Sequence, residues 1–224
     1  EEYYNGSLLN SERKTSKTMT NMMGLDAMNN DNLALEKNIT REEVVSKMRD
    51  ILETMKSSAR EAREREVYSI SGLIGGDAYK MQNYLKSGKS LTGDTMVLAM
   101  AMALSSSEVN ASMGKIVACP TAGSCGILPA ALLSAGERLN ASDDELIKGL
   151  FASAAIGMII GRNATFSGAE GGCQAECGSA SAMASAAIVE LMGGTPEMAL
   201  HAGAIIFKNI LGLVCDPVAG LVEI

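Results

Sequence analysis

The sequence predicts an all-α fold, a compact multi-helix domain whose helices are connected by glycine-rich loops. Hydrophobic residues make up 47% of the 224 residues, which is enough to build a substantial core. Aromatic residues contribute only 4%, whereas Gly and Met occur 23 and 15 times. Small and flexible side chains favour closely packed helices. No alternating run of β-branched residues competes with the helical patterns described below.

The helical domain is predicted to begin at residue 40. Residues 1–39 show no sustained period, so we interpret them as an N-terminal tail or loosely docked segment and assign the domain to residues 40–224. Thr40 followed by Glu43 is a candidate capping box, and it opens an amphipathic helix over residues 41–66. The next two predicted helices cover residues 92–104 and 127–139.

Three more helices are predicted in the C-terminal half. Ser142 and Glu145 open a helix that runs through Ile160. Residues 173–192 form a helix rich in Ala, Ser, Gly and Cys, and Thr195 before a proline opens a last helix that ends near residue 211. Charged side chains fall from 24 in residues 1–66 to 8 in residues 150–224, so the C-terminal third is the predicted interior.

Charge and hydropathy argue against two kinds of partner. A formal net charge of −7 and a pI near 4.9 argue against binding to nucleic acid, whose partners concentrate Lys and Arg on one face. The longest apolar run, residues 150–160, is too short to cross a bilayer. Five cysteines without secretory features predict reduced thiols in the cytoplasm.

Three glycine-rich turns are candidates for binding chemistry, at residues 71–77, 120–126 and 167–172. The last two directly precede predicted helices. Backbone amides in such a turn, next to a helix N-terminus, can hold a carboxylate or a phosphate. None of the three matches a Walker A or a dinucleotide-binding pattern, and an ordinary tight turn is the alternative for each.

The cysteines and the single histidine are the other reactive side chains. Cys173 and Cys177 lie one helical turn apart, and Cys215 follows the last predicted helix. Thiolates are natural iron ligands, but this spacing is not a ferredoxin or zinc-ribbon signature, so buried cysteines without a metal are the alternative. His201 lies in the middle of a predicted helix, and we interpret it as a packed or surface residue.

Two segments resemble signature sequences of the iron-sulfur L-serine dehydratases. They are residues 167–176, Ser-Gly-Ala-Glu-Gly-Gly-Cys-Gln-Ala-Glu, and residues 211–222, Leu-Gly-Leu-Val-Cys-Asp-Pro-Val-Ala-Gly-Leu-Val. Residues 120–129 and 71–79 are similar to two further glycine-rich segments of the family, so the resemblance covers residues 41–224. The chain resembles the alpha portion of these enzymes, in the form in which the alpha and beta portions are separate polypeptides.

The resemblance implies a lyase subunit that converts L-serine to pyruvate and ammonia with a [4Fe-4S] cluster. Of the three cysteine ligands of that cluster, two map to Cys173 and Cys215, and the third is expected shortly after Ile224. We therefore expect the chain as given to hold no intact cluster and to be inactive. A beta chain is the expected partner in a hetero-oligomer. No ligand role is implied for Cys119, Cys125 and Cys177.

The family chemistry combines a Lewis acid with a base. The resemblance implies that an iron without a protein ligand polarises the substrate oxygens, that a base removes the Cα proton, and that the resulting aminoacrylate hydrolyses. Glu170 and Asp216 are the candidate catalytic residues, with turn and cap acceptors as their alternative roles; the base could also come from the beta chain. The candidate substrate-binding residues are Thr121, Gly123, Ser124, Ser167 and Gly168.

Two other classes of function remain as alternatives. A pyridoxal-phosphate dehydratase would make the same product, but it needs a Schiff-base lysine, and Lys115, Lys148 and Lys208 lie outside any glycine-rich phosphate cup. A non-catalytic helical scaffold that binds a partner chain through its Ala-rich surface is the second alternative.

Overall fold

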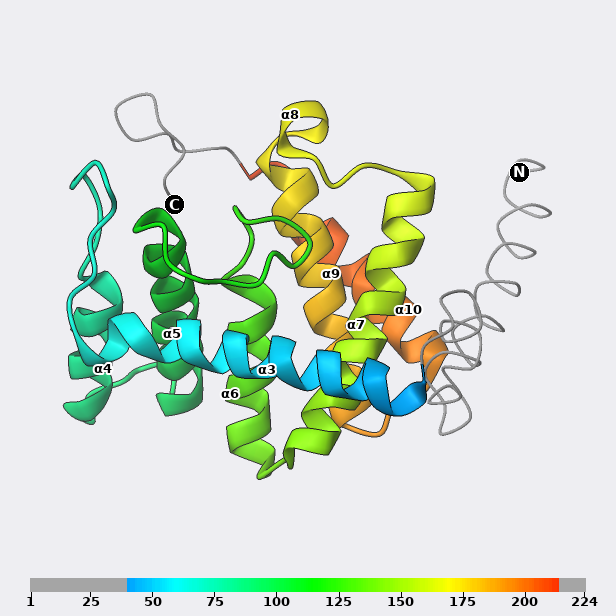
Figure 1. Ribbon diagram of the computed structural model, residues 1–224, viewed down its shortest axis with the longest axis horizontal. Helices are drawn as coiled ribbons and strands as arrows, with labels where there is room; N and C mark the ends of the chain where they lie inside the picture. Colours follow the sequence, from blue (N-terminus) through cyan, green and yellow to red (C-terminus); the bar gives the residue numbers. More distant parts are fainter. Residues whose placement is uncertain (1–39, 214–224) are drawn as a thin grey trace.

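A computed structural model of the chain describes residues 40–213, in which the regular elements are all helices, apart from one isolated bridge between Tyr68 and Gly75 (Figure 1). This confirms the predicted all-α fold. The helices, in chain order, are α3 (Arg41–Glu64), α4 (Asp77–Lys86), α5 (Asp94–Ala111), α6 (Ile127–Leu139), α7 (Asp143–Asn163), α8 (Gly168–Gly171), α9 (Cys173–Leu191) and α10 (Pro196–Ile210). The predicted tail, residues 1–39, lies outside the described residues.

Local capping explains why the predicted starts of α3, α7 and α10 are correct. The Thr40 amide donates to the Glu43 carboxylate at 2.7 Å, and the Glu43 amide donates back to the Thr40 hydroxyl at 3.2 Å. Ser142 and Glu145 repeat this capping box at the start of α7, with distances of 2.7 and 3.4 Å. At the start of α10 the Thr195 hydroxyl accepts from the Met198 amide. Each cap satisfies backbone donors that the first turn leaves open.

Helix α5 continues beyond the predicted end at Leu104 to Ala111. Serines normally weaken a helix, because their hydroxyl groups compete for backbone hydrogen bonds. Here Ser105 and Ser106 are buried against α3: the Ser105 hydroxyl donates to the Ser58 carbonyl at 2.6 Å, and the Ser106 and Ser58 hydroxyl groups lie 3.2 Å apart. These tertiary contacts outweigh the local preference and extend the helix.

Helix α4 was not predicted, and its N-terminus is capped by a residue from α5. One carboxylate oxygen of Glu108 accepts hydrogen bonds from the amides of Asp77 at 2.6 Å and Ala78 at 3.1 Å. Glu108 is only 4% exposed, and its other oxygen has no hydrogen-bond partner within residues 40–213. Burial raises the pKa of Glu108, although the two amide hydrogen bonds act in the opposite direction.

The raised pKa of Glu108 predicts that its effect on stability depends on pH. Below the ordinary Glu pKa of about 4.3, the carboxyl is neutral in the folded and the unfolded chain. As the pH rises from there through the raised pKa of the folded chain, the carboxyl ionises in the unfolded chain before it ionises in the folded chain. The free energy of unfolding therefore falls over this range. Glu108→Gln should therefore gain in unfolding free energy relative to the native chain between pH 4 and pH 7. Urea unfolding at both pH values tests this, and a constant difference would contradict it.

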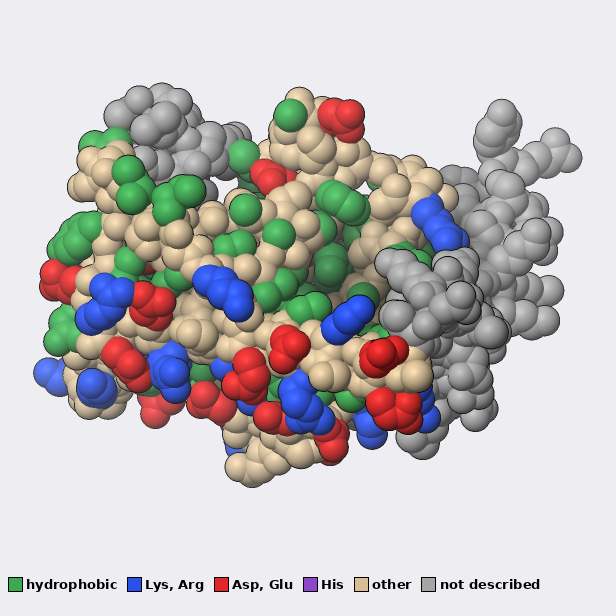
Figure 2. All heavy atoms as spheres, viewed as in Figure 1, with side chains coloured by type: hydrophobic (Ala, Val, Ile, Leu, Met, Phe, Trp, Pro, Cys, Tyr) green, Lys and Arg blue, Asp and Glu red, His purple; other side chains and the backbone are tan. Residues whose placement is uncertain are grey.

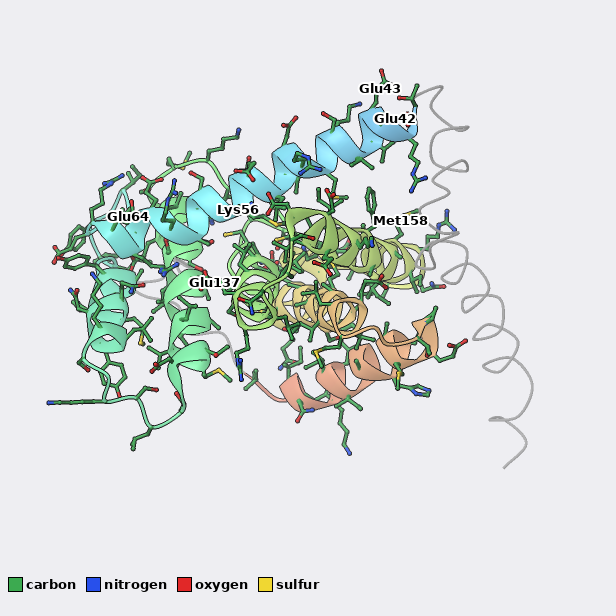
Figure 3. The ribbon with its side chains drawn as sticks, turned by 90° about the horizontal axis from the view of Figure 1, so that it is seen from below. Glu42, Glu43, Lys56, Glu64, Glu137 and Met158 are labelled. Atoms are coloured by element: carbon green, nitrogen blue, oxygen red, sulfur yellow. The ribbon has the colours of Figure 1, made fainter. Side chains whose placement is uncertain are left out.

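Helix α9 forms the centre of the domain. It packs against α6, α7 and α10, and its Ala180, Ala182, Ala186 and Ala187 are completely buried. Figure 3 shows α3 and α10 on opposite sides of the molecule, with α7 and α9 between them. The predicted interior is therefore correct for α9 and wrong for α10, on which Ile205 is 59% exposed, because only one side of α10 faces α9.

The helices from α4 onward run up and down, so that several connections meet at one end of the domain. Figure 1 shows the α3–α4, α5–α6 and α7–α9 connections at this end, together with the end of α10. These connections contain the three glycine-rich turns. Charged side chains follow α3 in a band, whereas the end that carries the turns shows few of them (Figure 2). None of the described helices is long and apolar enough to span a membrane.

Candidate active site

The loop 120–126 is held against the end of α5. The Asn110 side chain donates to the carbonyl of Ala122 at 3.2 Å, and the Cys125 thiol donates to the carbonyl of Ser106 at 3.6 Å. Gly126 is needed for this contact, because a Cβ there would lie 2.6 Å from the carbonyl oxygen of Ala103. The glycine-rich turn at residues 71–77 also lies near the end of α5, since the amide of Ile70, just before this turn, donates to the carbonyl of Ala111 at 3.1 Å.

The two cysteines of this loop region are buried. Cys119 and Cys125 are 4% and 1% exposed. Burial raises the pKa of Cys119 to about 12, with a smaller contribution from Cys125, and burial raises the pKa of Cys125 to about 11. Burial therefore disfavours the thiolate form that metal binding requires. That neither cysteine is an iron ligand stays a prediction.

Three candidate substrate-binding residues lie in this loop. Thr121 and Ser124 share a hydrogen bond of 3.0 Å between their hydroxyl groups, and Ser124 is buried while Thr121 is partly exposed. Gly123 is exposed. Among the described residues, the amides of Gly123 and Ser124 have no hydrogen-bond acceptor. The loop can therefore offer two backbone donors to a bound anion.

The second loop contains the other candidates and the short helix α8. The Ser167 amide donates to the Thr165 hydroxyl at 3.1 Å, and the Ser167 carbonyl accepts from the amides of Glu170 and Gly171. These two amides are therefore engaged within α8 and are not open to a ligand. Glu170 is exposed on α8, and Gly168 lies at the inner side of this loop, next to α9.

The two loops meet at Glu176, in the first turn of α9. A Cβ at Gly123 would lie 3.3 Å from Oε1 of Glu176, and a Cβ at Gly168 would lie 2.4 Å from its Oε2. Glycine at both positions leaves the space that the carboxylate occupies. Glu176 is not among the candidate site residues predicted from the sequence. Its place in the segment 167–176, three residues after Cys173 and hence on the same face of α9, was the signal that could have revealed it.

The start of α9 also lies beside the end of the described chain. Cys173 is the first residue of α9, and Cys177 follows one turn later. The side-chain amide of Gln174 donates a hydrogen bond to the carbonyl of Leu213, two residues before Cys215. Burial, and then the neighbouring Cys173 and Glu176, raise the pKa of Cys177. Cys215 and Asp216 lie outside the described residues, and residues 40–213 contain no group of three side chains able to hold a metal ion.

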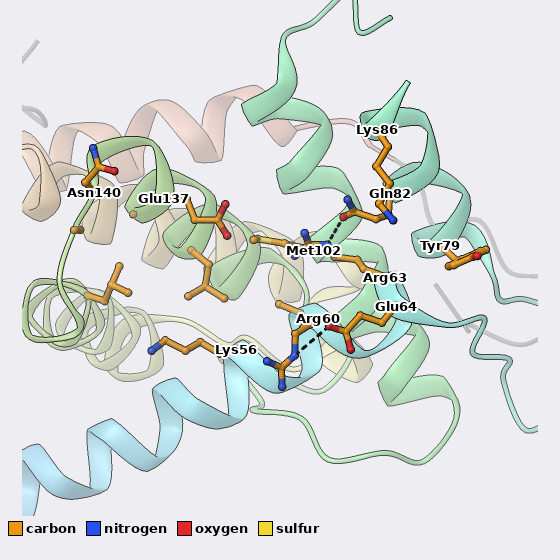
Figure 4. Close-up of a pocket in the computed structure, with 15 residues that line it drawn as sticks. Lys56, Arg60, Arg63, Glu64, Tyr79, Gln82, Lys86, Met102, Glu137 and Asn140 are labelled. Atoms are coloured by element: carbon orange, nitrogen blue, oxygen red, sulfur yellow. Dashed lines mark hydrogen bonds and ion pairs between the residues drawn. The ribbon is translucent and has the colours of Figure 1, made fainter. Parts of the chain in front are cut away.

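A groove of about 990 Å³ lies elsewhere, between α3, α4, α5 and α6 (Figure 4). Two of its charged groups have partners in the protein: Arg63 donates to Gln82 at 2.7 Å, and Lys56 forms an ion pair with Asp143 at 2.8 Å. None of the candidate site residues lines this groove. The candidate site predicted from the sequence therefore lies apart from this groove.

These features define an all-α domain that gathers glycine-rich loops, a carboxylate and a thiol-bearing helix N-terminus at one end. Comparison with known proteins identifies its family. The family model for the serine dehydratase alpha chain matches residues 7–224. The chain belongs to the serine dehydratase alpha chain family.

Named relatives agree with this assignment. The chain is 53% identical over 184 residues to the L-serine dehydratase alpha chain of Peptoniphilus asaccharolyticus, covering 82% of this chain and 63% of the relative. It is 51% identical over 185 residues to the probable L-serine dehydratase alpha chain of Bacillus subtilis, covering 83% and 61%. The L-serine dehydratase of Streptomyces coelicolor is 44% identical over 137 residues, covering 59% of this chain and 30% of the relative. The chain thus spans about three fifths of the length of the first two relatives.

Proposed function

We propose that the chain is part of the cluster-binding alpha subunit of an iron-sulfur L-serine dehydratase, a lyase that converts L-serine to pyruvate and ammonia. The observation that carries this proposal is the meeting of four segments at one end of the domain. They are the loop 120–126, the loop 167–172, the first turn of α9 with Cys173, and the segment that leads to Cys215.

Cys173 and Cys215 would hold the [4Fe-4S] cluster, and the chemistry around Cys173 fits such a ligand. The partial positive charge of a helix N-terminus favours a negatively charged group such as a thiolate. The contact between Gln174 and Leu213 brings the polypeptide that carries Cys215 to the start of α9. When bound, the cluster supplies a Lewis-acidic iron for the oxygens of the substrate.

The chain itself would bind and orient L-serine. The amides of Gly123 and Ser124 and the hydroxyl of Thr121 are donors suited to the substrate carboxylate. Gly168 borders the same space from the second loop, next to Glu176 of α9, and Ser167 directly precedes it. Glu170 and Asp216 remain the candidate catalytic residues, and Glu170 is exposed on α8.

A beta chain would cover part of this subunit. Helix α10 and the turn after it expose large apolar side chains, with Ile205 59%, Leu211 73% and Leu213 60% exposed. Apolar patches of this kind commonly mark contact surfaces between proteins. This supports a hetero-oligomer in which α10 lies at or near an interface. Thiolate ligands also fit the reducing conditions of the cytoplasm.

Reconstitution of the complete enzyme tests this function. The complete alpha chain and its beta partner, loaded anaerobically with iron and sulfide, should convert L-serine to pyruvate and ammonia in equal amounts. An iron chelator should abolish the activity, whereas hydroxylamine, which traps pyridoxal phosphate, should not. A loaded complex that makes no pyruvate would overturn the proposal, and activity without iron would favour a pyridoxal-phosphate enzyme.

A further inference from the structure

The carboxylate of Glu176 occupies a position between two loops that carry no positive charge. Residues 116–126 contain no charged side chain, and the charged side chains of residues 163–189 are Glu170 and Glu176. Glu176 itself is partly buried, and within residues 40–213 no ion pair or hydrogen bond joins its carboxylate to another group. A carboxylate in this setting lacks a counter-ion, which a bound cation would supply.

The carboxylate of Glu176 borders both loops. Oε2 of Glu176 lies so close to Gly168 that a Cβ there would be 2.4 Å away, and Gly123 borders Oε1 from the opposite loop. The same two glycines belong to the loops proposed to bind the substrate. The carboxylate therefore lies next to both loops, with the thiol of Cys173 on the same face of α9.

We infer that Glu176 binds the α-ammonium group of the substrate, and so selects amino acids over hydroxy acids. The inference rests on the proposed function, because the substrate it concerns is L-serine. The donors of the loop 120–126 suit the carboxylate of the amino acid, and Glu176 supplies the complementary charge for its ammonium group. No other acidic side chain of residues 116–126 or 163–189 lies between the two loops, because Glu170 is exposed on α8.

The test compares two ligands that differ in the ammonium group. The complete cluster-loaded enzyme is prepared as the native form and as Glu176→Gln, which keeps the shape and removes the charge. The Michaelis constant is measured for L-serine. The dissociation constant is measured by calorimetry for 3-hydroxypropionate, which keeps the carboxylate and the hydroxyl but has no ammonium group. We expect Glu176→Gln to raise the KM for L-serine about 10- to 100-fold, as for the loss of one charge-assisted hydrogen bond, and to leave 3-hydroxypropionate binding unchanged.

A matched variant and the cluster spectrum separate this role from a structural one. Glu190→Gln makes the same chemical change near the other end of α9, and it should alter neither ligand. All variants should keep the visible absorbance of the cluster. An unchanged KM, equal weakening of both ligands, or a fall in kcat alone would overturn the inference. The proposed function fails separately, if the native enzyme makes no pyruvate from L-serine.

Discussion

Replacing Cys173 with serine in the complete alpha chain is expected to remove bound iron and to reduce pyruvate formation to background. Of the two proposed ligands within this sequence, Cys173 is the one whose position is described, at the first residue of α9. A serine hydroxyl is not ionised near pH 7 and is a much harder donor than a thiolate, so it should not replace the sulfur ligand. Iron content per chain and visible absorbance, measured after anaerobic reconstitution, give the result.

Cys177→Ser provides the matched control, because Cys177 lies one turn further along the same helix. Its pKa is raised mainly by burial, which disfavours a thiolate ligand. This variant should keep its iron and most of its activity. Iron retained at the native level by Cys173→Ser would refute the ligand assignment. Thermal unfolding of both variants shows whether any loss of iron merely follows a loss of folding.

The helices that the sequence predicted well are those whose ends are set by neighbouring residues. The capping boxes at Thr40 and Ser142 and the Thr195 cap act within one turn, so they can be recognised without tertiary information. Helix α4 begins differently. Its first amides are satisfied by Glu108, which lies about thirty residues further along the chain, and no local pattern contains that contact.

The candidate site was predictable in its parts and not in their arrangement. The glycine-rich turns and Cys173 stand out in the sequence because of residue type and family resemblance. The role of Gly123 and Gly168 is visible only from the fold, since each makes room for the carboxylate of Glu176. Cys215 and Asp216 lie outside the described residues, so their assignments remain predictions.

The small residues of α9 connect the core with the candidate site. At Gly178, a Cβ would lie 2.7 Å from the Cδ1 atom of Ile210, so glycine there permits the close approach of α10. That approach brings the end of α10 to the first turn of α9, where Gln174 contacts Leu213. The small side chains of α9 bury little apolar area per residue. They also let α10 come close, and so they position the segment that leads to Cys215.

The core behind this arrangement should depend strongly on Leu132. This α6 residue is fully buried, and its Cδ1 would lie 3.1 Å from a Cβ at Gly149 on α7. Leu132→Ala should lower the free energy of unfolding by about 2–5 kcal/mol, because it removes apolar contacts and leaves a cavity. Urea unfolding followed by circular dichroism measures the change. A loss of this size is a large part of the roughly 5–15 kcal/mol that stabilises an ordinary domain.

Leu139→Ala gives the control for this prediction, because it makes the same substitution in the last turn of the same helix. Leu139 is 42% exposed, so its truncation removes less buried surface and should cost less than about 1 kcal/mol. Similar losses of unfolding free energy for the two variants would mean that α6 does not pack through Leu132.

The same pair of variants should also differ in iron retention. Because the core holds α6 and α9 in place, Leu132→Ala should weaken iron retention at moderate temperature, whereas Leu139→Ala should not. The start of α6 follows the loop 120–126 directly, so loosening this helix would disturb the loop that faces Glu176.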